Sequence, residues 1–350
     1  MEARLKEDRV RAEKASIPEL YEKGYYGRPK GNELELRCVE AAFLLYREKL
    51  KIELEGKALN FRAFFEQASL REKNFELKYI VYKDLRERGY YVQPSSTDFR
   101  VYPRGGHPGK TAAKSFVYVH SERAPLPVQE LLEAVDAAEN VHKQLILAIV
   151  DEESDITFYE AKTLEPKGEM EQYYPKIRAE GTFLEDRVIV WEKNSSKKLY
   201  EYGFYGKALD SERLQLSLVE SLYLLEKGVL GLKDRKGKSL KPETFLEKAS
   251  LIEEAFFRKF KVYRALRDSG HVAKTGFKFG THFRVYRKVK SPEKIPHSEY
   301  LVSAIPGAFE FRLPVMSGAV RLANSVRKRM LFAIEESEEL RFLDIGRVKL

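Results

Sequence analysis

Residues 245–273 read FLEKASLIEEAFFRKFKVYRALRDSGHVA, and residues 64–92 read FFEQASLREKNFELKYIVYKDLRERGYYV. Charged and apolar residues keep the same order through both stretches. Further matching pairs lie on either side, in the same order and at a nearly constant offset: 7–31 with 185–209, 97–102 with 281–286, and 140–149 with 325–334. Self-similarity of this kind is the signature of an internal repeat. The chain is therefore a tandem duplication, and its fold is that of one unit used twice.

Within each copy the periodicity changes from helical to alternating, which predicts helices first and a sheet with one late helix second. We expect helices over 214–228 (stopping at Gly228), from Pro242 onward, over 255–270 and over 319–334, and strands at 187–192, 283–288, 298–305 and 340–350. The predicted fold class is α+β. Each unit combines a small helix-rich mixed α/β N-terminal subdomain with an α/β catalytic-type subdomain that has a mixed central sheet.

Pro and Gly interrupt any regular pattern at the junction of the two copies. The predicted boundaries are a first N-terminal subdomain (1–77), a degenerate catalytic-like subdomain (78–165), a linker (166–181), a second N-terminal subdomain (182–258) and a catalytic subdomain (259–350).

Composition is that of an ordinary globular protein, with 43% hydrophobic and 33% charged residues among 350. The net charge of +9 is compatible with a polyanionic partner. The single cysteine, Cys38, excludes an intramolecular disulfide and a cysteine-based zinc cluster. No apolar stretch approaches 18 residues and the first residues are too polar for a signal peptide, so we expect a cytoplasmic protein without a membrane partner.

Three residue types in the second copy could carry chemistry: Tyr286 at the end of FRVY, His297 at the start of the next predicted strand, and Lys328 on the predicted helix 319–334. Arg321 lies seven residues before Lys328, so both cations would project from one helix face. Two aligned cations repel each other unless an anion sits there. The alternative interpretation is a solvated basic face.

The first copy serves as a control for this group. Aligning HSEYL with KSFVY sets Lys114 against His297, while Asp136 stands in the place of Arg321. Tyr102 and Lys143 correspond to Tyr286 and Lys328. Loss of an imidazole together with inversion of a charge favours one catalytic copy and one structural copy.

Tyrosine, histidine and lysine could together cleave RNA without a metal or other cofactor, because the 2′-hydroxyl is an internal nucleophile. The reaction needs a base for the 2′ proton, an acid for the leaving 5′ oxygen, and a cation for the charge on phosphorus. Histidine suits the acid and lysine the cation. Tyrosine is a poor base unless cations such as Arg284 and Lys328 lower its pKa, so Tyr286 could instead orient the nucleophile. Around these residues the sequence has no Asp/Glu cluster with metal-ligand spacing.

The combination GFKFGTHFRVY, HSEYLV and SVRK resembles the archaeal tRNA-splicing endonucleases of the fused two-repeat kind, over essentially the whole chain. This resemblance implies a homodimer that removes introns from precursor tRNA, cutting both boundaries at a bulge–helix–bulge and leaving 2′,3′-cyclic phosphate and 5′-hydroxyl ends. It also implies Tyr286 as general base, His297 as general acid and Lys328 as transition-state stabiliser.

The resemblance further implies RNA and dimer contacts. Arg321 and Arg347 would clamp a flipped bulge base between two guanidinium groups, and Arg284 would face the RNA from the strand of Tyr286. An acidic loop would dock into a basic cleft of the partner, for which Asp151, Glu152 and Glu153 are the candidates. A solvated charge run is the alternative for that loop, and the role of His282 stays open.

Two other functions compete with this prediction. The chain could be a non-catalytic RNA-binding or structural subunit of a tRNA-processing complex, which the intact Tyr286, His297 and Lys328 disfavour. It could also be a metal-dependent nuclease on a similar sheet, whose cleavage would stop in EDTA.

Overall fold

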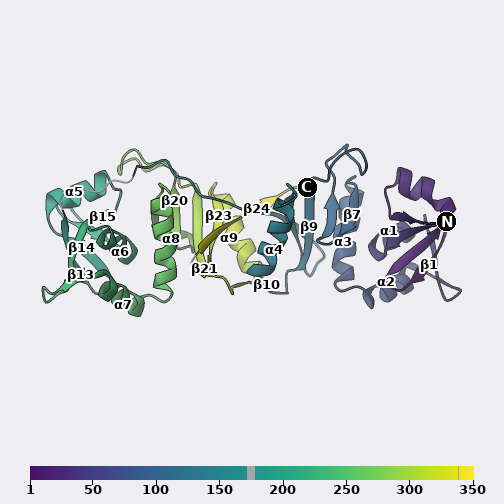
Figure 1. Cartoon of the computed structure of the whole chain (residues 1–350), viewed down its shortest axis with the longest axis horizontal. Helices are drawn as coiled ribbons and strands as arrows, with labels where there is room; N and C mark the ends of the chain where they lie inside the picture. Colours follow the sequence, from purple (N-terminus) through teal and green to yellow (C-terminus); the bar gives the residue numbers. More distant parts are fainter. Residues whose placement is uncertain (172–177, 338) are drawn as a thin grey trace. The chain divides into compact units, whose positions relative to one another are not determined.

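The computed structural model describes residues 1–171, 178–337 and 339–350. The chain forms two compact units, each with its own core. The first unit consists of Met1–Lys162, Glu310–Ser317 and Gly346–Leu350, and the second of Thr163–Phe309 and Gly318–Ile345. The first unit therefore includes two segments that belong, in sequence, to the second copy (Figure 1). The finer division of each copy at 77/78 and 258/259 stays a prediction.

Both copies begin with a six-stranded sheet of one topology, ordered β3-β4-β2-β1-β5-β6 and β15-β16-β14-β13-β17-β18. The first copy contributes β1 (Glu2–Lys6), β2 (Arg9–Glu13), β3 (Arg28–Lys30), β4 (Glu33–Arg37), β5 (Lys51–Leu54), β6 (Lys57–Leu59), α1 (Cys38–Tyr46), α2 (Phe61–Ser69) and α3 (Phe75–Glu87). The second copy contributes β13 (Ala179–Leu184), β14 (Arg187–Val190), β15 (Lys207–Ala208), β16 (Leu214–Leu216), β17 (Leu230–Lys233), β18 (Ser239–Leu240), α5 (Lys193–Glu201), α6 (Leu218–Glu226), α7 (Pro242–Ile252) and α8 (Phe256–Asp268).

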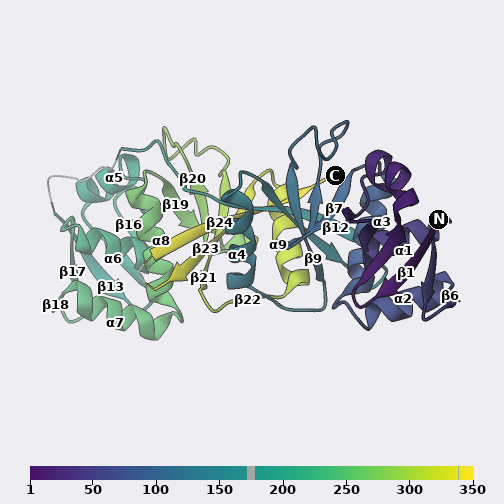
Figure 2. The ribbon, with the colours of Figure 1, turned by 45° about the vertical axis from the view of Figure 1, so that its right-hand side comes forward.

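Local sequence explains the limits of these helices. Ser217 and Glu220 form a capping box at the start of α6, so the expected helix begins at Leu218 and the residues before it form β16. Gly228 follows α6 with φ 70°, as a helix stop requires. Pro242 opens α7, and Gly270 follows α8 with φ 83°. Figure 2 shows α6 and α7 beside β13 and β17.

A second sheet follows in each copy. In the first unit its strands are ordered β12-β11-β9-β8-β7, and in the second β19-β20-β21-β23-β24. The first set comprises β7 (Val92–Ser95), β8 (Asp98–Val101), β9 (Ser115–Ser121), β10 (Leu126–Pro127), α4 (Val128–Glu139), β11 (Gln144–Val150) and β12 (Ile156–Thr163). The second set comprises β19 (Val272–Thr275), β20 (Phe283–Tyr286), β21 (Tyr300–Pro306), β22 (Glu310–Phe311), α9 (Leu313–Ser325), β23 (Arg329–Glu336) and β24 (Glu339–Val348). Since β21 pairs parallel with β23 while the neighbouring pairs are antiparallel, the sheet is mixed, and the predicted α+β class is confirmed.

One predicted element is wrong. The helix expected over 319–334 ends at Ser325, and the residues from Arg329 onward form β23. The apolar run Met330–Ile334 is short and continuous, and such a run fits a buried strand as well as a buried helix. Arg327 has φ 57°, which reverses the chain between the two elements. Arg321 and Lys328 therefore do not share one helix.

The two borrowed segments belong to the packing of the first unit. Leu126 of β10 pairs with Phe311 of β22, and the Tyr159 hydroxyl lies 2.6 Å from the Ser317 hydroxyl. Val348 and Leu350 pack against the first core. Within the described part of the chain, every helix is too short or too polar to cross a membrane.

Candidate active site

Three neighbouring strands of the second unit bring the predicted catalytic segments to one end of the sheet. Val285 of β20 pairs with Tyr300 of β21, which in turn pairs with Arg329 of β23. Tyr286 follows the first of these residues and Lys328 precedes the last, so the two flank Glu299 at the same sheet end. His297 lies two residues before Glu299. The antiparallel β20–β21 pair and the parallel β21–β23 pair thus bring Tyr286, Lys328 and the segment that follows His297 to one end of the sheet.

Lys328 is anchored at this end. It lies in the connection between α9 and β23, where its amide donates to the Ala323 carbonyl (2.8 Å). Its side chain is buried, and Nζ donates to the Ser298 carbonyl at 3.2 Å. Nζ also lies 5.8 Å from the centroid of the Phe279 ring. The ammonium group is thereby fixed beside the peptide that follows His297.

His297, predicted to open this strand, lies in the loop before β21, which begins three residues later at Tyr300. Its side chain is exposed while the adjacent Ser298 is buried. An exposed imidazole next to the peptide that anchors Lys328 is accessible to a substrate.

Tyr286 has the opposite environment. It is 4% exposed, and burial raises the pKa of its hydroxyl, an effect that the Arg284 charge only partly offsets. The sequence suggested that nearby cations could lower the pKa of Tyr286. In the structure that pKa is raised instead. At neutral pH the phenol is protonated.

The segment joining the two copies holds the chain next to Tyr286. Glu169 donates its amide to the Arg287 carbonyl (2.8 Å), and its carboxylate pairs with the Arg287 guanidinium (3.0 Å). The Val289 amide lies 3.2 Å from the Met170 sulfur, and Met170 packs against the cluster that contains Tyr286. The linker thus forms part of the wall around this tyrosine.

Strand register corrects the comparison between copies. Val101 pairs with Ser115, as Val285 pairs with Tyr300. The Lys114 amide also donates to the Val101 carbonyl, as the Glu299 amide does to Val285. Lys114 therefore occupies the place of Glu299.

Counting back two residues from Lys114, as His297 precedes Glu299 by two, gives Ala112. The connecting loop is one residue shorter in the first copy, and the shared serine in KSF and HSE drew the sequence alignment out of register. The first copy still lacks an imidazole at this place.

The other counterparts keep their places. The Lys143 amide donates to the Ala138 carbonyl as the Lys328 amide does to the Ala323 carbonyl. Asp136 of α4 therefore occupies the position that Arg321 has in α9. Arg321 is exposed on the last turns of its helix. The inverted charge is therefore a difference between equivalent sites.

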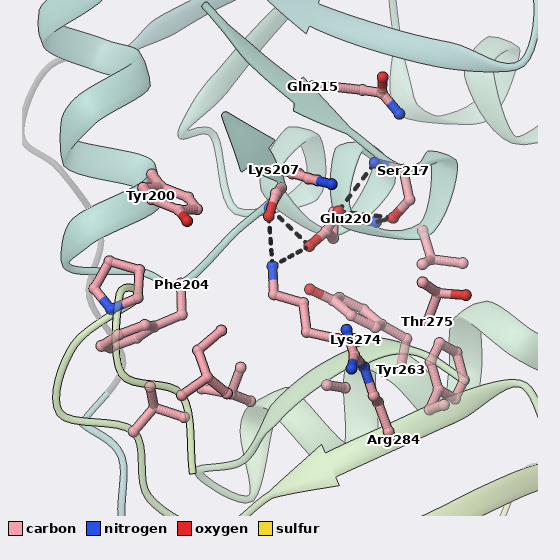
Figure 3. Close-up of a pocket in the computed structure, with 18 of the residues that line it drawn as sticks. Tyr200, Phe204, Lys207, Gln215, Ser217, Glu220, Tyr263, Lys274, Thr275 and Arg284 are labelled. Carbon is pink, nitrogen blue, oxygen red and sulfur yellow. Dashed lines mark hydrogen bonds and ion pairs between the residues drawn. The ribbon is translucent and has the colours of Figure 1, made fainter. Parts of the chain in front are cut away.

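Arg284 lines a cavity of about 460 Å³ between α6 and β19–β20. Figure 3 shows it extending from β20 toward Lys274 and Tyr263. Its Nε is buried and has no hydrogen-bond partner among the described residues. Lys274 Nζ donates to the Glu220 carboxylate (3.1 Å) and the Gly206 carbonyl (2.8 Å). This ion pair could not be predicted from the sequence, because its members are far apart in the chain and no local pattern links them.

Glu220 is buried, which by itself would raise its pKa, but Lys274 and the amides of Ser217 and Gly206 lower that pKa below its ordinary value. Two of the charged side chains that line the cavity, Glu220 and Lys274, therefore form an ion pair. His282 also lines the cavity, where burial lowers its pKa and its Nδ1 accepts from the Ala304 amide (2.8 Å). That hydrogen bond ties the side chain of His282, in the turn before β20, to the backbone of β21.

Arg347 and the acidic segment lie in the first unit. Arg347, at the end of β24, is exposed and lines a cavity with Asp151. The acidic residues follow the strand β11. Asp151 accepts from the amides of Glu153 (3.0 Å) and Asp155 (2.8 Å), while Glu152 pairs with Arg123. Part of this charge therefore stabilises the β11–β12 turn.

Comparison with known proteins agrees with the duplication. The family model described as the catalytic C-terminal domain of tRNA intron endonuclease matches residues 75–158 and 256–342. The model of the N-terminal domain of the same family matches residues 1–65 and 179–246.

Relatives that align along the chain are named tRNA-splicing endonuclease. The protein of Methanosarcina mazei is 69% identical over 350 residues, which cover 100% of this chain and 99% of that protein. The protein of Methanococcoides burtonii is 61% identical, with both chains covered completely. The protein of Halobacterium salinarum is 40% identical over 92% of each chain.

Proposed function

The chain belongs to the tRNA intron endonuclease family, and we propose that it cleaves precursor tRNA at both intron boundaries within a bulge–helix–bulge, by attack of the 2′-hydroxyl. The products are a 2′,3′-cyclic phosphate and a 5′-hydroxyl. The observation that carries this proposal is the meeting of Tyr286, the His297–Ser298 peptide and Lys328 at one end of β20, β21 and β23.

Each residue has one task in the proposed reaction. Tyr286 in its phenolate form accepts the proton of the 2′-hydroxyl, and the oxygen freed of that proton attacks phosphorus. His297 gives a proton to the 5′ oxygen as the phosphorus–oxygen bond breaks. Lys328 stabilises the charge that builds on the non-bridging oxygens, and its hydrogen bond to Ser298 holds it beside the histidine.

The proposed reaction uses no metal, because the nucleophile belongs to the substrate and the three side chains provide proton transfer and charge stabilisation. Among the described residues, no three His, Cys, Asp or Glu side chains gather as a metal cluster would. The test for metal dependence is activity in EDTA.

Recognition of the RNA is assigned to arginines. Arg321 and Arg347 are both exposed, which supports the proposal that their guanidinium groups stack on a flipped bulge base. Arg284, with an unpartnered Nε, supplies a further cation on the same repeat as the site.

We further propose that the protein acts as a homodimer in the cytoplasm. The acidic loop Asp151–Glu153 would dock at the cavity of the partner's second unit, whose lining includes Lys207 and Arg284. Glu153 is exposed, and charge reversal there (Glu153→Lys) should shift the light-scattering mass toward the monomer at low salt, where the new repulsion is least screened. A mass unchanged from wild type would exclude this loop from the interface.

The decisive experiment incubates the purified protein with a bulge–helix–bulge RNA in EDTA and determines the chemistry of the new ends. Cyclic phosphate and 5′-hydroxyl ends, lost in His297→Ala, support the proposal. Binding without cleavage would indicate the non-catalytic subunit instead. EDTA-sensitive cleavage or 5′-phosphate ends would indicate a metal-dependent nuclease.

A further inference from the structure

The turn between β19 and β20 exposes an aromatic ring that the fold does not use. Phe277 is 86% exposed at the start of a single 3₁₀ turn, Phe277–Phe279. Leu251 is exposed to a similar degree, but its counterpart Leu70 is exposed in the first copy as well. Exposure at 251 is therefore a property of the repeated fold, whereas Phe277 needs a separate explanation.

The first copy has no such ring. Thr275 pairs with Phe283 across the turn, and the equivalent pair in the first copy is Pro94 with Phe99. Residues 276–282 separate the first pair, and only residues 95–98, which read SSTD, separate the second. The longer aromatic turn thus occurs in the copy that has the histidine.

The turn has a defined shape that directs its two phenylalanines differently. The Gly276 amide donates to the His282 carbonyl (3.0 Å), and a Cβ on Gly276 would lie 2.8 Å from the Thr281 carbonyl oxygen. Gly280 has φ 65°, which disfavours other residues. The Phe279 ring lies against Lys328 Nζ (5.8 Å), while Phe277 faces solvent.

We propose that Phe277 is a stacking platform for an unpaired base of the RNA substrate, next to the phosphate that is cleaved. The exposed cation of Lys278 would contact the neighbouring backbone phosphate. Unpaired bases stack on aromatic side chains, which supply sequence-tolerant affinity. The contact of Phe279 with Lys328 sets this platform beside the reacting centre. The inference rests on the proposed RNA cleavage and adds a substrate-positioning residue to it.

The test uses the cleavage-defective His297→Ala protein with bulge–helix–bulge RNAs that carry 2-aminopurine at one unpaired position at a time. Stacking on Phe277 should quench the fluorescence at one position. Adding Phe277→Ala should restore it and weaken binding roughly 10- to 100-fold, whereas Phe277→Tyr should behave as the parent. Leu251→Ala, an equally exposed site on α7, is the matched control and should change neither quantity.

An abasic nucleotide at the quenched position provides the second arm. If a base stacks there, Phe277→Ala should cost no affinity for the abasic RNA. Equal loss on intact and abasic RNA, or none on either, would overturn the inference, as would a change in oligomeric mass that accounts for the loss. These results leave the proposed function standing if wild-type protein cleaves the RNA. If wild-type protein neither binds nor cleaves it, both proposals fail together.

Discussion

The two copies of the repeat differ at the same end of the same sheet. Tyr102 and Lys143 occupy the positions of Tyr286 and Lys328, because the strands next to them pair in the same register in both copies. Yet Ala112 replaces His297, and Asp136 replaces Arg321. The comparison shows that the tyrosine and lysine survive in a copy without the histidine, so their presence alone does not mark a site.

Each copy also has a cavity lined by a buried glutamate, Glu40 in the first and Glu220 in the second, and the two glutamates differ in their partners. Glu40 and Glu220 are both buried, and each accepts from a glycine amide, Gly27 or Gly206. In the second copy Lys274 pairs with the glutamate, whereas strand register places Gln93 at that position in the first copy. Without a lysine, burial raises the pKa of Glu40. The Tyr102 hydroxyl donates to Gln93 (2.8 Å) and is thereby occupied.

The largest effect is expected from the lysines. Lys328→Ala should lower the single-turnover cleavage rate by about 10²- to 10³-fold, because it removes the cation that faces the developing charge. Lys143→Ala, the matched change in the first copy, should leave that rate within about twofold. Circular dichroism melting controls for folding, since Lys328 is buried. Equal loss in both variants would contradict the assignment of one working copy.

The next effect concerns stability. Lys274→Gln introduces the residue of the first copy and leaves Glu220 buried without its partner, which should cost about 3 kcal/mol at pH 7. The pKa of Glu220 should then rise above its unfolded value. Its protonated form stabilises the fold at low pH, and that contribution is lost as pH rises through the raised pKa. Urea unfolding at pH 5 and pH 7 should therefore show the smaller loss at pH 5; an equal loss at both would exclude a buried, unpaired Glu220.

A smaller effect separates two roles of Tyr286. An ordinary imidazole has a pKa of about 6.5. If a phenol with a raised pKa is the base and an imidazole is the acid, the ionised fraction of one rises as the protonated fraction of the other falls. The rate should then stay level between the pKa of the acid and the raised pKa of the phenol, and decline on both sides.

If Tyr286 only orients the 2′-hydroxyl and water accepts its proton, the rate should instead fall about tenfold per pH unit once the imidazole has lost its proton. We expect the level profile, together with a loss of roughly 10- to 100-fold in Tyr286→Phe. Tyr102→Phe is the control from the first copy and should keep the wild-type profile.

The smallest effect is expected from restoring a single residue. Ala112→His in a His297→Ala background should produce no cleavage, because Asp136 and the hydrogen bond of Tyr102 to Gln93 remain. New cleavage products on a gel would show that the histidine alone separates the two copies.

The duplication, the α+β class and the strand of FRVY could be predicted from sequence, since repeats and alternation are local signals. The start of α7 and the end of α8 could be predicted as well, from Pro242 and Gly270. The strand that begins at Arg329 could not be predicted, because its short apolar run fits the periodicity of a buried helix as well as that of a buried strand.

The counterpart of His297 was wrong by two residues for a different reason. A loop that differs in length has no internal signal for its register, and only the pairing of Val101 with Ser115 fixes it. The Lys274–Glu220 pair and the contact of Met170 with the Tyr286 cluster join segments distant in sequence, which local patterns do not reveal.

The segments Glu310–Ser317 and Gly346–Leu350 complete the first unit although the second copy encodes them. A gene split at the linker would therefore yield an N-terminal half that lacks part of its own core. That half would recover Phe311 and Ser317 only by meeting the other polypeptide, at whatever concentration the cell holds. Fusion makes this encounter intramolecular, with an effective concentration set by the tether instead of by expression. A continuous reading frame thus keeps the two halves at equal stoichiometry under dilution.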